Sequence, residues 1–495
     1  MNEETRLGLK VMVAAVVLGI AGDILLIMRP LGINLFIWMA FLLTATVLII
    51  KREKIDAMGD GKLLIAPIIF FSAAFAWRDS ATLHALDMLA LMGCLLLGSS
   101  TVRAGRLRIA GFAHYAASAI ISGFETAFGF LILIFGDIEW KSVRGGGLTR
   151  RVFSVLLGLL IATPIIIVFG SLLASADSAF ASILSGIFTF NSDWVMVHLI
   201  AIAAGSWFVA GFLHRAFLGS VVKETKLDLP FEFSLGITEI SIILGSLDLL
   251  FLSFVIVQFK YFFGGAARVV STAGLSYAEY ARSGFFELVT VTALVLPLLL
   301  AAHWLLKKGN QIHERIFKGL AIAMISLLSV IMVSAVQRMR LYQAEYGMTE
   351  LRLYTTVFMG WLAIVFAWFI YTVLRGQRER FVFGAMTSAF AAIVILNAIN
   401  PDAMIVRINA QRAEAGKRID TQYLMSLSAD AVPALIDAFP DLPEYSKKVS
   451  AKSIIEQWSN QGDPGWRSWN WSRSRARGMA GRNQQMLRGV MASKN

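Results

Sequence analysis

Cysteine is almost missing from this sequence, and charged residues are scarce. The 495 residues include one cysteine, Cys94, so the chain can form no internal disulfide and no thiolate metal cluster. Charged residues make up 16% of the chain, whereas a typical soluble domain carries about 25%. Hydrophobic residues make up 57%, and the mean hydropathy is +0.68. A water-soluble fold could not bury that much apolar surface, so the composition excludes an ordinary soluble domain.

The motifs of familiar ATP-driven pumps and hydrolases are also absent. There is no Walker A sequence, no H-E-x-x-H, no G-x-S-x-G, no G-x-G-x-x-G and no cysteine pair. Each of these motifs places groups that bind phosphate, hold zinc or carry a nucleophile. The sequence therefore leans away from an enzyme, and it indicates no catalytic residue, no metal site and no cofactor.

Long hydrophobic runs fill the first four fifths of the chain instead. Runs of about 18 or more residues recur, and a run of that length crosses the ~30 Å hydrocarbon layer of a bilayer as a helix. They predict an all-α fold, a polytopic transmembrane helix bundle of about 11–12 spans. The expected spans are 10–28, 32–50, 62–77, 82–99, 111–136, 152–174, 194–217, 236–260, 283–306, 315–337, 353–375 and 379–399.

The chain changes character after residue 399. Residues 1–399 are predicted to form the transmembrane helical domain, and residues 400–495 a polar, helical C-terminal region that ends in a Trp/Arg-rich tail. In this region Asn400 precedes Pro401, which combines a helix-capping side chain with a proline that suits the first helical turn. Similar start signals recur, so the region is expected to hold about four or five short helices and no strands.

Positive charge outweighs negative charge, with a formal net charge of +12. Most Lys and Arg residues lie in short connections between apolar runs, which indicates membrane lipids as partners and not nucleic acid. If every span crosses once, the cation-rich connection 51–62 lies on the opposite side from 141–151 and 307–318. Either the fifth span, 111–136, is not a simple crossing, or the positive-inside bias is weak. From the sixth span onward, the balance of charge places the C-terminus outside.

Six acidic side chains fall within the predicted spans, where each costs roughly 2.5 to 3.5 kcal/mol at the bilayer centre. They are Asp23, Asp87, Glu125, Glu239, Asp248 and Glu287. On the fifth span, His114, Ser118 and Glu125 lie within about 40° of one another. This polar stripe has two interpretations. It could form part of a proton or ion path, or it could make interhelical hydrogen bonds that fix the packing.

Two connecting segments concentrate charge beside a span. Glu279 and Arg282 lie in YAEYARSGFFEL, a charged segment that runs directly into the ninth span. In RMRLYQAEYGMTELRLY, Gly347 and Thr349 predict a tight helical hairpin, because they suit a helix C-terminus and an N-cap. The charged group around this hairpin is Arg338, Arg340, Arg352, Glu345 and Glu350. It could bind a substrate, or it could stabilise the hairpin.

The tail segment DPGWRSWNWSRSRAR, residues 463–477, interleaves tryptophan with arginine. Nucleic-acid binding uses such residues, because aromatic rings stack on bases and arginines contact phosphates. The same residues serve to dock on a membrane surface or to pack on the protein's own helices. We expect one of the last two arrangements.

Four segments carry a resemblance to a known family. They are YAEYARSGFFEL, YGMTELRLY, NPDAMIVRINAQR from residue 400 and YLMSLSADAVPAL from residue 423. The chain resembles an uncharacterised family of bacterial multi-pass inner-membrane proteins, a domain of unknown function of the 4173/4153 type. The similarity covers the second half well and the first half by hydropathy alone. It implies a location in the bacterial cytoplasmic (inner) membrane, and it implies no catalytic residue because the activity of the family is not established.

Three functions fit the sequence. The first is a secondary-transporter-like or channel-like protein for a small solute or ion, with Glu125, Asp248 and Glu287 as its leading site residues. The alternative is a non-enzymatic sensor or assembly scaffold for a membrane or envelope protein partner, which the helical C-terminal region favours. The third is a membrane-embedded enzyme acting on lipid or cell-wall intermediates, which rests on the charged groups at the hairpins.

Overall fold

A computed structural model describes residues 2–55, 59–102, 112–143, 172–180, 192–219, 235–263, 285–307, 311–459 and 465–492, with a few isolated residues between them. Within these ranges every regular element is a helix, and the β contacts amount to one isolated bridge between Leu235 and Leu306. The predicted all-α fold is therefore confirmed.

Before residue 400 the described helices are α1 (Glu3–Leu26), α2 (Ile33–Arg52), α3 (Ile65–Trp77), α4 (Ala81–Thr101), α5 (Phe112–Ile132), α6 (Trp140–Val143), α9 (Ser192–Phe217), α10 (Ile237–Phe263), α13 (Phe285–Leu305), α14 (Gln311–Tyr346), α15 (Glu350–Thr372) and α16 (Phe381–Ile399).

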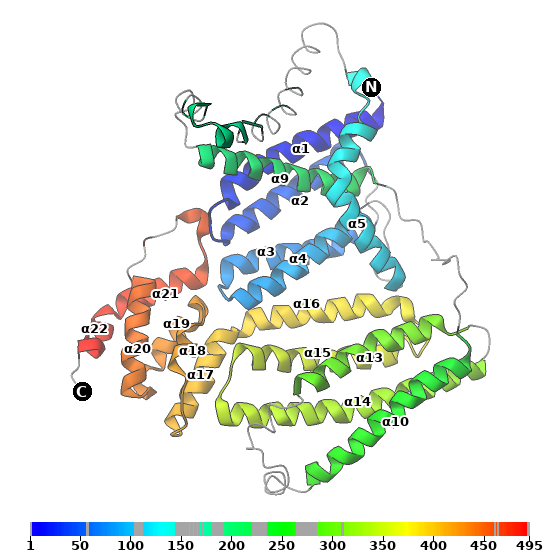
Figure 1. Ribbon diagram of the computed structural model, residues 1–495, viewed down its shortest axis with the longest axis vertical. Helices are drawn as coiled ribbons and strands as arrows, with labels where there is room; N and C mark the ends of the chain where they lie inside the picture. The colour runs from blue at the N-terminus through cyan, green and yellow to red at the C-terminus, as the bar shows by residue number, and fades with distance from the viewer. Residues whose placement is uncertain are drawn as a thin grey trace.

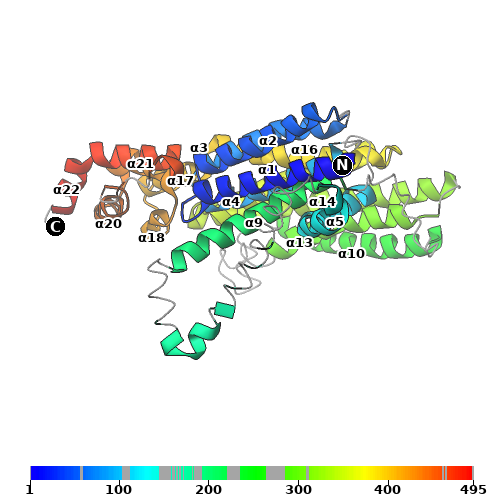
Figure 2. The ribbon, with the colours of Figure 1, turned by 90° about the horizontal axis from the view of Figure 1, so that it is seen from above.

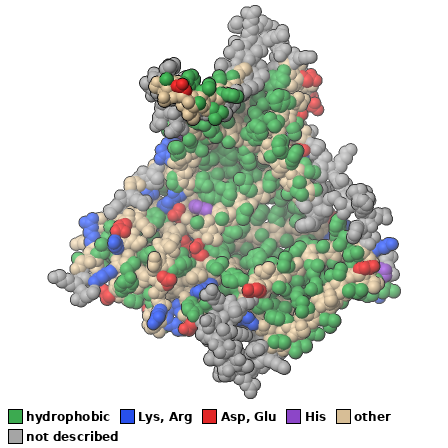
Figure 3. Space-filling view, viewed as in Figure 1, with side chains coloured by type: hydrophobic (Ala, Val, Ile, Leu, Met, Phe, Trp, Pro, Cys, Tyr) green, Lys and Arg blue, Asp and Glu red, His purple; other side chains and the backbone are tan. Residues whose placement is uncertain are grey.

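Eleven helical segments among the described residues are long and apolar enough to cross a membrane. Along them, only 11% to 39% of the most apolar 18-residue window is buried inside the protein. Figure 3 shows hydrophobic side chains covering the surface over these helices. Apolar surface left this open is stable in lipid and not in water, so the chain is a multi-pass membrane protein. Eleven of the twelve predicted spans correspond to these segments. The twelfth, 152–174, lies outside the described residues apart from residues 172–174 and a few isolated positions.

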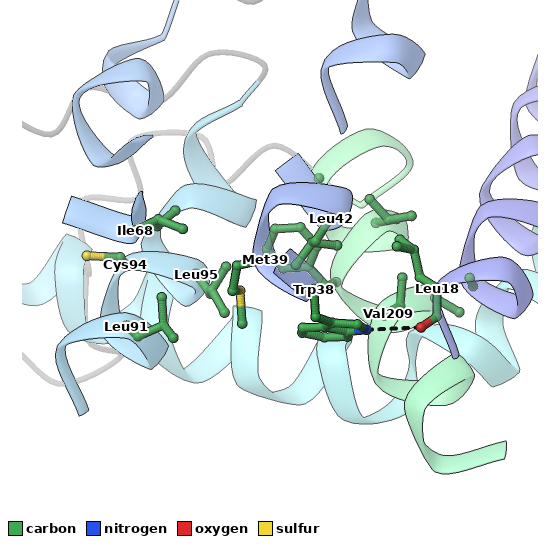
Figure 4. Close-up of a cluster of buried hydrophobic side chains, with 14 of the residues drawn as sticks. Leu18, Trp38, Met39, Leu42, Ile68, Leu91, Cys94, Leu95 and Val209 are labelled. Carbon is green, nitrogen blue, oxygen red and sulfur yellow. Dashed lines mark hydrogen bonds between the residues drawn. The ribbon is translucent and has the colours of Figure 1, made fainter. Parts of the chain in front are cut away.

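The spans pack into two apolar clusters that α16 joins (Figure 1). The first cluster belongs to α1–α5 and α9, and Figure 4 shows part of it, where the indole Nε1 of Trp38 donates a 3.0 Å hydrogen bond to the carbonyl oxygen of Leu18. The second belongs to α10, α13, α14 and α15. Helix α16 places Phe390 against the first cluster and Phe381 in the second. Both clusters are therefore held in one bundle.

The two ends of this bundle differ in chemistry. At one end, which we call the junction end, α1, α3, α14 and α16 finish, and the C-terminal helices lie beyond them (Figures 1 and 2). At the other, which we call the cationic end, α1, α3, α14 and α16 begin. The cations described there include Arg6, Lys10, Lys51, Arg52, Lys54, Lys62, Arg215, Lys307, Arg315, Lys318, Arg375, Arg378 and Arg380.

Helix α5 does not run from one end of the bundle to the other. Just after it, the carbonyl of Asp137 accepts a 3.4 Å hydrogen bond from the Thr5 hydroxyl, which lies in the first turn of α1. Near its start, Tyr115 is under the electrostatic influence of Asp60 and shares an apolar cluster with Phe383, in the first turn of α16. Both ends of α5 therefore lie at the cationic end, and Figure 1 shows it steeply inclined to the neighbouring spans.

The course of α5 removes the conflict between charge and topology. Because α5 begins and ends at the cationic end, the described parts of the connections 51–62 and 141–151 lie on the same side. The described residues of 307–318 lie there too, where α13 ends and α14 begins. The fifth predicted span is thus not a simple crossing, and the cation-rich connections share one end as the positive-inside rule requires.

The helices after residue 400 bury a third apolar cluster, which also includes Met348 and Leu353 from the α14–α15 connection and the start of α15. They are α17 (Pro401–Glu414), α18 (Thr421–Met425), α19 (Val432–Asp437), α20 (Glu444–Ile454), α21 (Trp471–Arg482) and α22 (Gln484–Ala492). The predicted start signal at Asn400 is confirmed, because its side chain accepts a hydrogen bond from the backbone N–H of Ala403 and Pro401 occupies the first turn. Ile405 and Leu435 are among the buried side chains of this cluster. We refer to these helices together as the C-terminal region.

Candidate functional site

The contact between the bundle and the C-terminal region contains a dense group of buried polar side chains, which we call the junction. It includes the loop 78–80 between α3 and α4. The 3-10 turn η4 (Ala429–Ala431) and helix α21 contact this loop. Its members with less than one tenth of their surface exposed are Arg78, Ser80, Asp87, Asn397, Asp402, Asp430, Asn470 and Ser472. Polar groups buried this deeply are stable only when they are hydrogen-bonded, so their partners determine what the junction does.

The carboxylate of Asp430 is the centre of the junction. Its Oδ1 accepts from Nη1 of Arg78 at 3.2 Å, and its Oδ2 accepts from the backbone N–H groups of Asp79 at 2.6 Å and Ser80 at 3.1 Å. The hydroxyl of Ser472, on α21, donates to the same carboxylate. One side chain therefore ties together the α3–α4 loop, η4 and α21.

Arg78 extends this network into the membrane part of the bundle. Its Nε donates to the carbonyl oxygen of Asn397 at 2.7 Å, and its guanidinium lies 4.5 Å from the centre of the Trp77 ring. The amide of Asn397 in turn donates to Oδ1 of Asp87, on α4, at 2.9 Å. A continuous chain of polar contacts thus runs from the C-terminal region to a fully buried carboxylate within the spans.

The Trp/Arg-rich tail packs on the bundle. The amide of Asn470 donates to the carbonyl oxygens of Phe75 at 2.8 Å and Arg78 at 2.5 Å. The carbonyl of Trp469 accepts from the backbone N–H of Ile33 at 2.9 Å. The tail therefore packs on the protein's own helices, which is one of the two predicted arrangements. The rings of Trp466, Trp469 and Trp471 stay 40% to 65% exposed.

Two carboxylates of the junction lie outside the spans and hold their protons unusually tightly. Burial raises the pKa of Asp402 to about 6, and the Ser428 hydroxyl, which donates to it at 2.6 Å, offsets this only in part. Burial also raises the pKa of Asp79 to about 6, against the lowering influence of Arg473, whose Nε lies 3.0 Å from Oδ1 of Asp79. The junction can therefore take up protons near neutral pH.

The predicted helical hairpin is confirmed, and it contributes to the junction. Gly347, with φ +80°, follows α14, and Thr349 precedes α15 in the N-cap position. The carboxylate of Glu350 accepts from the Thr82 hydroxyl at 3.1 Å, and the backbone N–H of Glu350 donates to the Tyr423 hydroxyl at 2.7 Å. Of the charged hairpin residues, Glu350 is therefore the one that links α4, α15 and the C-terminal region.

The other charged hairpin residues point elsewhere. The Arg352 guanidinium lies 4.0 Å from the centre of the Tyr342 ring, and Glu345 pairs with Lys417 at 3.7 Å on the surface. Arg340 is exposed. The structure does not gather these side chains into one binding site.

Of the three remaining charged residues singled out from the sequence, the structure describes Arg338. Arg338 donates to Oε1 of Gln258, on α10, at 3.1 Å. Glu279 and Arg282 lie outside the described residues.

Two intramembrane acids, besides Asp87, have a partner on another helix. Asp23, on α1, pairs with Nδ1 of His198, on α9, at 2.7 Å. Glu125, on α5, pairs with Nη1 of Arg215, on α9, at 3.1 Å. These contacts hold neighbouring helices together at different depths, because His198 lies near the beginning of α9 and Arg215 near its end.

Of the polar stripe on α5, Glu125 faces α9, where Arg215 contacts it. Ser118 is buried, whereas the side chain of His114 lies outside the described residues. Close approach of the two helices is possible because Gly129 meets Gly211, where a Cβ on Gly211 would lie 1.9 Å from the carbonyl oxygen of Thr126. Within the described part of the stripe, Glu125 therefore makes an interhelical contact.

The remaining intramembrane acids lie far apart along the bundle. Both carboxylate oxygens of Asp248, in the middle of α10, are buried and have no hydrogen-bond partner in the part of the chain that the structure describes. Glu239 and Glu287 are exposed in the first turns of α10 and α13, which begin at opposite ends of the bundle. Glu125, Asp248 and Glu287 are thus not brought together at one site.

Sequence reasoning missed most of the residues that form the junction. They are Arg78, Asp79, Asp402, Asn470 and Ser472. One available signal was the connection of only three residues between two spans, 78–80, which carries two opposite charges. Another was Asn470, whose side chain caps α21 by accepting from the backbone N–H of Arg473 at 2.9 Å. Neither signal predicts which residue of the other segment it contacts across the junction.

The model of a family described as Domain of unknown function (DUF4153) matches residues 65–438, which is more than half of the chain. No curated protein and no solved structure matches the sequence. The matched range begins at α3 and ends just after α19, so it contains Arg78, Asp402 and Asp430. The tail that closes the junction from the other side lies beyond it.

Proposed function

Because the chain belongs to the DUF4153 family, whose shared domain has no known function, we propose a function from its own geometry: it is a non-enzymatic membrane sensor or assembly scaffold. In this proposal the C-terminal region presents a surface to a membrane or envelope protein partner. The junction couples that surface to the spans. Binding of a partner to the C-terminal region therefore affects the position of the transmembrane helices, and the reverse.

The observation that carries the proposal is the set of contacts around Asp430. Units of one chain usually move relative to each other unless their interface is large and well bonded. Here a carboxylate that is 3% exposed binds Arg78 and the backbone of the α3–α4 loop. Breaking a buried pair of this kind costs about 3–5 kcal/mol. Such a rigid connection allows a movement of the C-terminal region to be transmitted to the transmembrane helices.

The distribution of charge supports a location for the C-terminal region. Cation-rich connections favour the cytoplasm, whereas long regions cross the membrane largely regardless of their charge. In our proposal the cationic end faces the cytoplasm of a bacterium and the C-terminal region lies on the other side of the cytoplasmic membrane. Exposed Tyr445, on α20, would then be reached from outside the cell.

The single cysteine makes this orientation simple to test. In a Cys94→Ala background, Tyr445→Cys on α20 and Ile312→Cys at the cationic end introduce exposed thiols, since Tyr445 is 76% and Ile312 63% exposed. A membrane-impermeant maleimide should label the first variant in intact cells and the second after permeabilisation. Labelling in the reverse order would overturn the orientation.

The scaffold proposal is tested by photocrosslinking in cells. A photoreactive residue in place of Tyr445 should give one reproducible crosslinked product, and Asp430→Ala should abolish it while the protein stays in the membrane. A photoreactive residue in place of Leu249, which is 69% exposed on α10, is the matched control facing lipid. Crosslinks that are absent across the exposed face of α20, or that persist in Asp430→Ala, would exclude a scaffold that works through the junction.

One observation favours a carrier as the second candidate. Asp248 keeps both carboxylate oxygens buried without a hydrogen bond from the described residues, and an unpaired intramembrane acid is a common proton or ion site. Reconstituted vesicles would then show proton- or sodium-dependent flux that Asp248→Asn abolishes and the exposed Glu239→Gln preserves. Equal flux in both variants, or none in the unmodified protein, would count against this candidate.

A further inference from the structure

A cavity lies at the cationic end, on the opposite side of the bundle from the junction. It has a volume of about 560 Å³ and is formed where α13 ends, α14 begins and the α15–α16 connection passes. Leu306, Phe317 and Val373 line it with buried apolar side chains. Its ionisable lining consists of His303, Glu314, Lys318, Arg378, Glu379 and Arg380. The cavity therefore combines an apolar floor with charges of both signs.

The walls of the cavity are held in place by local contacts. Gly376, with φ +79°, turns the chain after α15, and the backbone N–H of Gln377 donates to the carbonyl of Thr372 at 2.8 Å. The ring of His303 lies 5.3 Å from the ring of Phe317. Volumes of roughly 300 to 1,000 Å³ are typical of small-molecule sites, so this one exceeds the needs of a bare phosphate ion.

The charges in the cavity are arranged by depth. Lys318, Arg378 and His303 are half-buried, whereas Glu314 and Glu379 are exposed at the rim together with Arg380, whose Nη1 donates to Oε1 of Gln377 at 3.3 Å. Half-buried Lys and Arg attract a phosphate, which accepts several hydrogen bonds from them. The two carboxylates at the rim would repel a simple anion and attract a cation. The lining therefore fits a ligand with an inner negative group and an outer positive group.

Aromatic side chains place the cavity at the depth of the lipid headgroups. Trp304, next to His303, is 47% exposed, and Tyr371, near the end of α15, is 52% exposed. The guanidinium of Arg375 lies 4.9 Å from the centre of the Tyr371 ring. Exposed Trp and Tyr favour the boundary between hydrocarbon and water. A lipid in this position has its phosphate near the membrane and its terminal group nearer water.

From this arrangement we infer that the cavity binds a phosphate ester that carries a primary amine. The phosphate contacts Lys318 and Arg378, and the ammonium group contacts Glu314 and Glu379. The headgroup of phosphatidylethanolamine has this chemistry, and so does soluble phosphoethanolamine. The site is independent of the proposed function of the junction, because it lies at the other end of the bundle.

Native mass spectrometry of the full-length protein in detergent tests this site. The protein is mixed in turn with phosphatidylethanolamine and with phosphatidylglycerol, which has the phosphate but no amine. Phosphatidylethanolamine should be retained more strongly, and Arg378→Gln should lower its retention about fivefold. Glu379→Gln should lower retention of phosphatidylethanolamine and leave that of phosphatidylglycerol unchanged.

Arg315→Gln is the matched control, because Arg315 lies on the same helix as Lys318, is exposed and does not line the cavity. Its lipid retention should equal that of the unmodified protein. Free phosphoethanolamine distinguishes the sources, since displacement of the lipid by this compound indicates a soluble ligand and persistence of the lipid indicates a membrane ligand. Equal retention of both lipids by the unmodified protein, or equal effects of Arg378→Gln and Arg315→Gln, would overturn the inference.

Discussion

The junction end and the cationic end of the bundle use charge in different ways. Arg78 and Asp430 pair at 3.2 Å with side chains that are 10% and 1% exposed, whereas Arg6 and Glu53 pair at 3.0 Å while the Arg6 side chain is 49% exposed. A buried pair is costly to desolvate and very costly to break. An exposed pair is screened by water and salt. Similar ion-pair chemistry therefore joins two parts of the molecule at one end and contributes little to stability at the other.

Asp430→Ala should have the largest effect, because it weakens the attachment of the C-terminal region at the junction end. The substitution leaves the Arg78 guanidinium and the N–H groups of Asp79 and Ser80 without their shared acceptor. We expect the C-terminal region to be held about 3–5 kcal/mol less tightly, seen as faster hydrogen exchange in α20 to α22. Glu456→Ala is the control, since its exposed 3.9 Å pair with Lys452 contributes under about 1 kcal/mol. Equal protection in the two variants would contradict a central role for Asp430.

The junction should also be more stable in mild acid. The pKa of Asp402 rises from 3.8 to about 6 on burial, so the folded state binds its proton more tightly than the unfolded chain. The resulting stability is fully present below about pH 4 and is lost as the pH rises through about 6, a change of roughly 3 kcal/mol. Asp79 acts in the same direction. In thermal unfolding between pH 4 and 7.5, Asp402→Asn should flatten this dependence, and an unaltered slope would exclude Asp402 as its source.

The crosswise position of α5 at the cationic end can be tested through Gly211. A methyl group there would lie 1.9 Å from the carbonyl oxygen of Thr126 and would push α5 away from α9. Gly211→Ala should therefore lower the stability of the purified protein by about 1–3 kcal/mol. Gly123→Ala, on α5 itself, meets no atom within 4 Å and should be neutral or slightly stabilising. Similar melting temperatures for the two variants would contradict the close contact.

The smallest effect is expected at Glu53. Its carboxylate pairs with Arg6 at 3.0 Å and with Lys10, and both cations are more than two fifths exposed. The hydrogen bond from Lys10 lowers the pKa of Glu53 below its ordinary 4.5, so the contribution is present above that pH and lost as the pH falls. Glu53→Gln should cost under about 1 kcal/mol, and the difference should vanish in high salt. A loss as large as that in Asp430→Ala would remove the contrast between the two ends.

The helices themselves were largely predictable. The expected span 194–217 corresponds to the candidate span Trp194–Phe217, and the hairpin at Gly347 was predicted from a glycine and a capping threonine. These features are local, because the free energy of moving apolar residues into lipid adds along one helix and a cap acts within one turn.

The polar contacts were far less predictable. Asp87 and Glu125 were recognised as intramembrane acids that need a partner, and the structure gives them Asn397 and Arg215. The free-energy cost of burying a carboxylate is evident from the sequence of its own helix. The hydrogen-bond partner that offsets this cost lies on another helix.

What the sequence by itself determined is therefore which segments enter the membrane and how the first C-terminal helix, α17, begins. The tertiary structure decided that α5 stays at one end and that Arg78 meets Asp430, a residue 352 positions away. The physical reason is the distance along the chain over which each interaction acts. Hydrophobic transfer and helix capping act within a few turns, but a buried ion pair forms only after packing has brought distant segments together and removed the water between them.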